Sequence, residues 1–258
     1  MKTAIVVGGG QTLGEYICKG LAAAGYKVGV ADLNVQNAVK VADEICTLQG
    51  ENISVGVGVD ATDEQSVSDA FKTIKEQLGS IDVLVYSAGV AKATKITDFT
   101  LQDFNFNVNV NLNGYFLCAR EAARHMVQQG NGGRIIQINS KSGKVGSKHN
   151  AGYSSAKFGG VGLTQSIALD LADDKITVNS LMLGNLLESP MFQSLIPQYA
   201  KKLGLQEHEV MQHYIDKVPL KAGCGYDDVL NVLKFYISDG AKYCTGQSIN
   251  ITGGQVMF

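Results

Sequence analysis

The sequence predicts an α/β fold in which helices cover both faces of a doubly wound parallel sheet of about seven strands. Three observations support this prediction. Short, continuously apolar runs, typical of strands buried on both faces of a sheet, recur along the chain. They alternate with longer amphipathic stretches, and the links between the two are short, as in parallel β-α-β units. A glycine-rich turn at 8–14 joins the first apolar run to the first helix.

The elements are expected in regular alternation along the chain. Strands are expected at residues 3–8, 27–31, 53–59, 82–86, 134–139, 176–182 and 247–251. Helices are expected from the glycine turn to about residue 25, at 35–49, 63–78 and 101–129, from Tyr153 to about 173, and at 226–238. Because the chain has no linker rich in Pro, Gly or Ser, we expect a single domain over residues 1–258.

The stretch 185–222 departs from this alternation. It lies between a strand and the next sheet-packing helix, and it holds two short amphipathic segments at about 190–203 and 206–217. A connection of this length within a compact domain usually has a function. We therefore expect a small helical lid over the substrate site, inserted at 185–222.

Composition and charge argue against several classes of protein. The 258 residues are 45% hydrophobic and 18% charged, with a formal net charge of −2, so neither nucleic acid nor a membrane is an expected partner. No apolar run approaches the roughly 20 residues that span a bilayer. The N-terminus runs directly into a strand without a signal peptide, which predicts a cytoplasmic protein. The five dispersed cysteines are typical of reduced thiols, and no metal is expected.

The first β-α-β unit has the features of a dinucleotide site. The turn at 8–14 precedes a helix whose first N–H groups and dipole suit a pyrophosphate. Asp32 ends the second strand at about the spacing from this turn at which a carboxylate binds the ribose diol of NAD. A carboxylate repels a 2′-phosphate, and neither Gln11 nor Leu33 supplies a cation, so we expect NAD and not NADP.

Tyr153 and Lys157 are the main candidates for proton transfer. Their spacing places both side chains on one face of a helix. A free tyrosine has a pKa of about 10, but an ammonium group close to the phenol favours the phenolate and lowers that pKa. Ser140 follows the strand at 134–139, so its hydroxyl is expected to face the tyrosine. The pair alone is weak evidence, because two such residues often share an exposed helix face.

Together these motifs resemble the short-chain dehydrogenase/reductase family over essentially the whole chain. The matching pieces are, in order, the turn at 8–14, Asp32, Asp60-Ala61, Ser87-Ala88-Gly89, Val110-Asn111-Leu112, Ser140, Tyr153 with Lys157, Val178-Asn179, Thr245-Gly246-Gln247 and Gly253-Gly254. The resemblance implies a Rossmann-type fold, NAD as the cofactor and a homo-oligomer, with a homotetramer the expected assembly.

The resemblance also implies the roles of individual residues. Tyr153 would be the general acid/base, Lys157 would lower its pKa and bond the nicotinamide ribose, and Ser140 would hold the substrate oxygen. Asn111 would order a water that links Lys157 to solvent. The cofactor-binding residues that it implies are Gly8, Gln11, Thr12, Leu13, Gly14, Asp32, Asp60, Ala61, Ser87, Ala88, Gly89, Tyr153 and Lys157.

Four positions depart from the family pattern. Thr12 stands where the family usually has glycine, and a side chain there is expected to disturb the turn that approaches the cofactor. Val7 replaces a common threonine, Ser87 a common asparagine, and Leu183 a common proline before Gly184. None of these positions handles the proton.

Charge predicts an anionic substrate. The chain has 24 acidic residues, yet none lies between residues 122 and 169. The basic residues of this window are Arg124, Arg134, Lys141, Lys144, Lys148 and Lys157, and Lys92 and Lys95 follow the Ser87-Ala88-Gly89 turn. Lysine suits a phosphate, and Lys141 and Lys148 are the best candidates to bind one. With the resemblance, this implies a phosphorylated hexitol, D-sorbitol 6-phosphate, oxidised at C2 to fructose 6-phosphate; a solvated basic surface is the alternative.

Two other functions remain open. A reductase of the same fold would act on another keto substrate, such as a 3-oxoacyl thioester. A cofactor-binding scaffold without catalysis would not need Asn111, Ser140, Tyr153 and Lys157, which are all present.

The expected subunit contacts involve the region 107–128 and the helix after Tyr153. Gly159, Gly160 and Gly162 cost helix stability, which is understandable if they let two backbones approach closely. Packing of these glycines against the parent sheet is the alternative.

Overall fold

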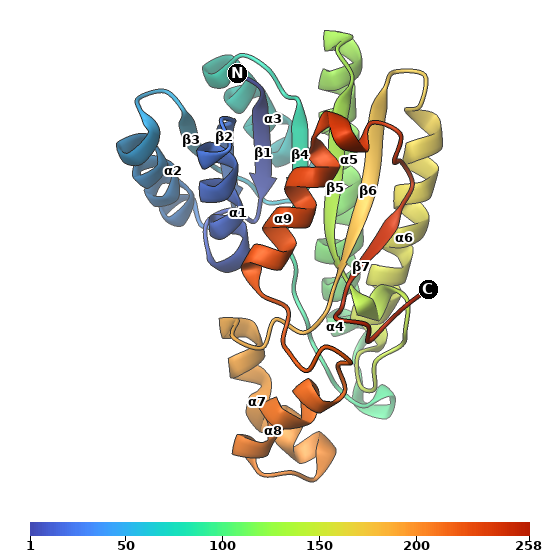
Figure 1. Cartoon of the computed structure of the whole chain (residues 1–258). Coiled ribbons are helices and arrows are strands. Elements are labelled where there is room, and N and C mark those ends of the chain that lie inside the picture. Colours follow the sequence, from blue (N-terminus) through green and yellow to red (C-terminus); the bar gives the residue numbers. More distant parts are fainter.

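One parallel sheet organises the molecule. The computed structural model describes residues 1–258, apart from the side chain of Met191. Within the described residues, seven strands pair in the order β3-β2-β1-β4-β5-β6-β7, all parallel (Figure 1). They are β1 (Thr3–Val7), β2 (Lys27–Asp32), β3 (Ser54–Gly58), β4 (Val83–Tyr86), β5 (Gly133–Ser140), β6 (Ile176–Leu183) and β7 (Ser248–Ile251). The strand order changes direction at the β1–β4 pair, so the predicted doubly wound sheet is confirmed.

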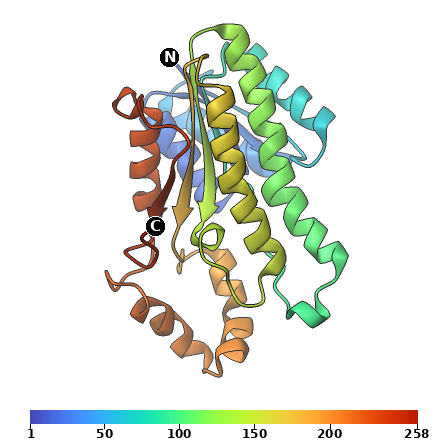
Figure 2. The ribbon, with the colours of Figure 1, turned by 90° about the vertical axis from the view of Figure 1, so that its right-hand side faces the viewer.

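Helices cover both faces of this sheet, as the sequence predicts. One face carries α1 (Thr12–Ala23), α2 (Val35–Gln49) and α9 (Tyr226–Ile237), whose buried residues form one apolar cluster with the sheet. The other face carries α3 (Glu64–Leu78), α5 (Gly114–Gln129) and α6 (Ala151–Asp170), which share a second cluster (Figure 2). The central strands are buried on both faces, which explains their continuous apolar runs.

The helical region predicted at 101–129 contains a break in its hydrogen-bond ladder. It comprises α4 (Leu101–Val108), a π-helical segment η2 (Asn109–Asn113) and α5. A π-helical turn frees backbone carbonyls from the regular ladder, and the Tyr86 hydroxyl donates a hydrogen bond to the carbonyl oxygen of Val110. A Cβ atom at Gly114 would collide with that hydroxyl. The glycine therefore allows Tyr86 to reach the helix.

The stretch after β6 forms a separate helical pair. It consists of α7 (Pro190–Leu203) and α8 (Glu207–Asp216), which lie beyond the carboxyl ends of the strands, below the sheet in Figure 1. These helices have their own apolar cluster, made by Leu187, Phe192, Ala200 and Val210. The two predicted amphipathic segments are thus confirmed as helices.

The glycines of α6 pack mainly within their own chain. A Cβ atom at Gly159 would lie 2.8 Å from Leu112, and one at Gly160 would lie 2.5 Å from the amide nitrogen of Gln137. At Gly162 an added Cβ would meet no described atom within 4 Å. The alternative of packing against the parent sheet therefore holds for Gly160, which meets Gln137 of β5, whereas Gly159 packs against the π-helical segment of its own chain and Gly162 faces open space.

No helix in the described part of the chain is long and apolar enough to cross a membrane. The described residues also contain no group of three or more His, Cys, Asp or Glu that could hold a metal ion. All five cysteines are free thiols.

Candidate active site

A cavity of about 500 Å³ opens at the carboxyl ends of the strands. Every residue predicted to bind the cofactor lies on its lining, together with Ser140 and Lys141. Helices α7 and α8 contribute the opposite wall through Phe192, Tyr199, Lys202 and Tyr214. Two predicted residues, Asn111 and Lys148, are not on the lining.

The glycine turn brings the backbone of β1 very close to that of β4. Gly8 has a φ of +80°, and a Cβ atom there would lie 2.7 Å from the amide nitrogen of Ala88. A Cβ atom at Gly14 would overlap the carbonyl oxygen of Gly8. Thr12 has a φ of +51°, in the left-handed region that a β-branched residue rarely adopts. The predicted disturbance at Thr12 is thus a strained backbone in an otherwise intact turn.

Asp32 ends β2 and is held in place by two backbone amides. Its Oδ2 accepts from the amide of Gly10 at 2.9 Å, and its Oδ1 accepts from the amide of Asn34 at 2.9 Å. Each carboxylate oxygen can accept a further hydrogen bond, so the group can still bind a diol. Gln11 and Leu33, its neighbours on the cavity lining, bring no positive charge.

Ser140, Tyr153 and Lys157 lie together on one wall of the cavity. Ser140 ends β5, while the other two project from the first turns of α6. The Lys157 ammonium lies 5.4 Å from the centroid of the Tyr153 ring and donates to the carbonyl oxygen of Ile138 at 3.3 Å. The Ser140 hydroxyl accepts from the amide of Ser142 at 3.1 Å and interacts with the Tyr153 side chain. The juxtaposition predicted from sequence is therefore present.

Burial dominates the ionisation of this tyrosine and this lysine. It raises the pKa of Tyr153 to about 12, and the hydrogen bond with Ser140 opposes part of that rise. Burial also lowers the pKa of Lys157 to about 8. The cost of desolvating the phenolate exceeds the effect of the Ser140 hydrogen bond, and the expected lowering of the tyrosine pKa by Lys157 stays a prediction. A base at Tyr153 therefore needs further positive charge beside the phenol.

Asn111 is fully buried within the π-helical segment. Its Nδ2 donates to the carbonyl oxygens of Val90 and Asn107, both at 2.8 Å, so its amide ties the loop after β4 to the helix. A Cβ atom at Gly89 would lie 3.2 Å from Asn111 Oδ1 and 3.9 Å from the Lys157 ammonium. Asn111 and Lys157 thus flank the same glycine, and the predicted water-ordering role of Asn111 stays a prediction.

Besides Lys157, two lysines reach the cavity from different parts of the fold. Lys141 follows Ser140, and its ammonium donates to Oε1 of Gln255 at 2.6 Å. Lys202, on α7, donates to the backbone carbonyl oxygen of Lys148 at 2.8 Å. The side chain of Lys148 itself is exposed and lies off the lining. Sequence reasoning missed Lys202, because a lysine near the end of an amphipathic helix is ordinarily a solvated one.

The other basic candidates are engaged elsewhere. Lys92 forms an ion pair with Asp103 at 3.4 Å and lies over the ring of Phe106. Lys144 donates to the carbonyl oxygen of Ser248 at 2.7 Å. Within the basic window 122–169, Lys144 thus makes a structural contact, whereas Lys141 and Lys157 line the cavity.

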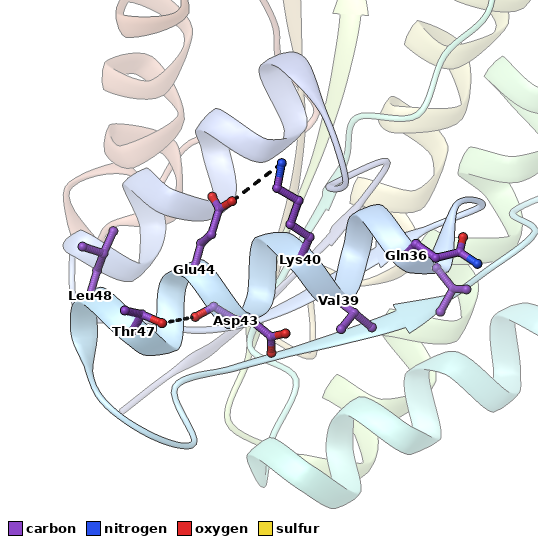
Figure 3. Close-up of a pocket in the computed structure, with 8 residues that line it drawn as sticks. Gln36, Val39, Lys40, Asp43, Glu44, Thr47 and Leu48 are labelled. Carbon is purple, nitrogen blue, oxygen red and sulfur yellow. Dashed lines mark hydrogen bonds and ion pairs between the residues drawn. The ribbon is translucent and has the colours of Figure 1, made fainter.

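A second hollow, of about 740 Å³, lies along the outer face of α2 (Figure 3). Its lining consists of Val35, Gln36, Val39, Lys40, Asp43, Glu44, Thr47 and Leu48. It is open to solvent, and Lys40 and Glu44, one turn apart on α2, form an ion pair at 3.9 Å between its two ends. No residue predicted for the site lies on this lining, so the chemistry belongs to the first cavity.

The residues of the first cavity fit a dinucleotide. The turn leaves no room for side chains at Gly8 and Gly14, so backbone can approach a pyrophosphate closely. Asp32 presents carboxylate oxygens that suit a diol. The Nδ2 of Asn185, on the lining, is buried and has no hydrogen-bond partner among the described residues, so it is free to donate to a ligand.

Comparison with known proteins places the chain in a family. The family model for short chain dehydrogenases matches residues 2–200. The chain belongs to the short-chain dehydrogenase family. It is 65% identical over 257 residues to the sorbitol-6-phosphate 2-dehydrogenase of Escherichia coli (strain K12), covering 100% of this chain and 99% of that one. The family resemblance inferred from the motifs is thereby confirmed, and the protein is an oxidoreductase.

Two solved structures extend the comparison. The crystal structure of sorbitol-6-phosphate 2-dehydrogenase from Erwinia amylovora has a TM-score of 0.98 and 66% identity, covering 99% of this chain and 100% of that chain. A structure of NAD⁺-bound xylitol dehydrogenase has a TM-score of 0.92 and 27% identity, covering 98% of both chains. The fold is therefore that of the family.

Proposed function

We propose that the protein oxidises D-sorbitol 6-phosphate at C2 to fructose 6-phosphate, reversibly, with NAD as the cofactor. The observation that carries the proposal is the similarity, over the full chain, to two enzymes named for this substrate. The cavity supports it, because proton-handling residues and unpaired lysines line the same space.

Tyr153 is the proposed general base. In the oxidation its ionised phenolate oxygen takes the proton of the C2 hydroxyl and becomes the phenol, and in the reverse reaction the phenol returns that proton. The bound NAD would supply a hydride acceptor for C2 and the positive charge of its nicotinamide ring. Such charge is what the phenol requires, since burial, opposed in part by the Ser140 hydrogen bond, raises the pKa of Tyr153 to about 12.

Ser140 and Lys157 support this proton transfer. The amide of Ser142 fixes the Ser140 hydroxyl, which is then available to donate to the reacting substrate oxygen. Lys157 binds the ribose of the cofactor and passes protons onward, a role suited to an ammonium whose pKa burial lowers to about 8. Asn111 holds the loop that contains Gly89 against this lysine.

NAD is proposed over NADP because of Asp32. Its carboxylate can accept from both hydroxyls of a ribose diol and repels a 2′-phosphate. The cofactor contacts are assigned to the residues of the glycine turn, to Asp60 and Ala61, and to Ser87, Ala88 and Gly89, which all line the cavity.

We also propose a homotetramer that acts in the cytoplasm as a single-domain enzyme, with residues 185–222 as its lid. Support for the assembly comes from exposed apolar side chains on α5 and α6. Phe116 and Phe158 are 41% and 46% exposed, and Leu169 is 81% exposed. Large exposed apolar side chains are what a subunit contact would cover. Light scattering that shows a monomer at micromolar concentration would refute it.

A substrate panel tests the proposed activity. The purified protein is incubated with D-sorbitol 6-phosphate, D-sorbitol or xylitol, each with NAD or NADP, and the nicotinamide absorbance is followed. A 3-oxoacyl thioester with reduced cofactor tests the alternative reaction of this fold. The expected result is rapid reduction of NAD with D-sorbitol 6-phosphate only; equal efficiency with the unphosphorylated polyol would end the proposal.

A further inference from the structure

Positive charge gathers where the helical pair faces the sheet. Lys141 belongs to the sheet side and begins the short 3₁₀ turn η3 (Lys141–Gly143), directly after Ser140. Lys202 belongs to the last turn of α7, and Lys217 directly follows α8. Lys202 lies 5.8 Å from the ring centroid of Tyr199, which is on the cavity lining. Two separate parts of the fold thus contribute ammonium groups to one place.

These ammonium groups are close enough to repel one another. Burial, together with Lys217 and Lys202, lowers the pKa of Lys141 to about 8. Burial, together with Lys148 and Lys217, lowers the pKa of Lys202. Among the described residues, none of these four lysines forms an ion pair with a carboxylate. Unpaired cations that are partly desolvated and mutually repelling are costly unless an anion joins them.

The hydrogen bonds that Lys141 and Lys202 make leave room for such an anion. Each ammonium has three donors, of which one is used on Gln255 Oε1 and one on the carbonyl oxygen of Lys148, respectively. Both acceptors are neutral, so both positive charges remain uncompensated. Gln255 also has an amide nitrogen that can donate to the same anion.

We propose that Lys141 and Lys202 bind the phosphoryl group of the substrate together, with Gln255 as a neutral third donor, so that this group joins the helical pair to the sheet. The inference rests on the proposed function and specifies its phosphate subsite. The sequence favours Lys141 and Lys148 as the residues that bind the phosphate. The structure supports Lys202 in place of Lys148, because Lys202 lines the cavity and the side chain of Lys148 does not. Lys141 adjoins Ser140 in the chain, so one six-carbon substrate can reach the phosphate subsite and the proton-handling residues at once.

The test compares the ratio of kcat/KM for D-sorbitol 6-phosphate to kcat/KM for D-sorbitol. Lys141→Met and Lys202→Met keep most of the apolar stem and remove the charge. Each is expected to lower the ratio by about 10- to 150-fold, the loss that one charge-assisted hydrogen bond represents. Lys201→Met is the matched control, because Lys201 is exposed, adjoins Lys202 on the same helix and lies off the cavity lining. The ratio of kcat/KM values for this variant should equal that of the wild type.

Inorganic phosphate supplies a second and independent readout. It is expected to inhibit the wild type competitively with the phosphorylated polyol, and its inhibition constant should rise at least tenfold in Lys202→Met. Thermal unfolding of each variant shows whether it has folded.

The outcomes separate the subsite from the activity. A wild type that prefers the phosphorylated polyol while Lys202→Met keeps the same ratio would overturn the subsite and leave the proposed function standing. A loss in Lys148→Met as large as that in Lys202→Met would also overturn the assignment. A wild type that oxidises the two polyols equally well would overturn both proposals.

Discussion

Cofactor preference should depend on the charge of Asp32. In the wild type the two carboxylate oxygens of Asp32 accept from the amides of Gly10 and Asn34, each at 2.9 Å. Asp32→Asn keeps the shape of the side chain and one oxygen that can accept from either amide. For NAD, the change converts charge-assisted hydrogen bonds into neutral ones, a loss of about 1–1.5 kcal/mol. We therefore expect kcat/KM for NAD to fall about tenfold.

For NADP the same substitution should act in the opposite direction. Two unit charges 4 Å apart near a protein surface interact by about 4 kcal/mol, and salt and solvent reduce this to roughly half. Removing that repulsion should raise kcat/KM for NADP by about 30-fold. The ratio of the two efficiencies should thus shift by about 300-fold, which initial rates at varied cofactor concentration measure.

The control for this prediction is Asp43→Asn. Asp43 is exposed on the outer face of α2, so its removal changes the net charge equally without touching the cavity (Figure 3). An unchanged ratio is expected for it. The reasoning would be refuted by a wild type that uses NAD and NADP with comparable efficiency, or by a shift in Asp43→Asn as large as that in Asp32→Asn.

Three further predictions concern the proton, the turn and the phosphate. Tyr153→Phe should lower kcat by about 10²–10⁴-fold and leave NAD binding, measured by fluorescence titration, largely intact. The control is Tyr243→Phe, because Tyr243 is fully exposed. A Tyr153→Phe variant that retains a tenth of the wild-type activity would contradict the assignment. Thr12→Gly should raise the free energy of unfolding, measured in urea, by about 1 kcal/mol. Removing the strain of a left-handed threonine stabilises the fold by about 1–3 kcal/mol, whereas the more flexible unfolded chain costs about 0.4–1 kcal/mol. A destabilised variant would show that the turn is not strained. Burial, together with Lys217 and Lys202, lowers the pKa of Lys141 to about 8. Lys141 is therefore charged below pH 8 and loses its proton above it. KM for D-sorbitol 6-phosphate should accordingly rise as the pH increases through 8. Lys141→Arg, which stays charged, should remove that rise, and an identical pH profile would count against the assignment.

The fold could be predicted from the sequence because local pattern and tertiary context agree along most of the chain. Continuous apolar runs such as the one that becomes β1 occur where a parallel sheet is covered on both faces, and the helices α1, α2, α3, α5 and α9 are amphipathic, although α6 is not. The π-helical break at Asn109–Asn113 could not be predicted in this way. The Tyr86 hydroxyl bonds the carbonyl oxygen of Val110 within this segment, a tertiary contact that no local pattern encodes.

Part of the candidate site could likewise be predicted from the sequence, and part of it could not. Residues that follow strands, such as Asp32 and Ser140, could be placed because the carboxyl ends of parallel strands meet at one edge. Lys202, Tyr199 and Gln255 could not, because they come from a helical pair and a terminal loop whose positions are set by packing. The ionisation of Tyr153 was also out of reach, since it depends on how completely the fold buries the phenol.

Isotope transfer from C2 of the substrate tests the central claim most directly. D-sorbitol 6-phosphate deuterated at C2 is supplied with NAD, and the reduced cofactor and the sugar product are examined by mass spectrometry. The account predicts that the deuterium passes to the nicotinamide, that the product is undeuterated fructose 6-phosphate, and that little deuterium reaches water. Deuterium retained in the product, or reduced cofactor without deuterium, would mean that the hydride does not come from C2 and would contradict the account.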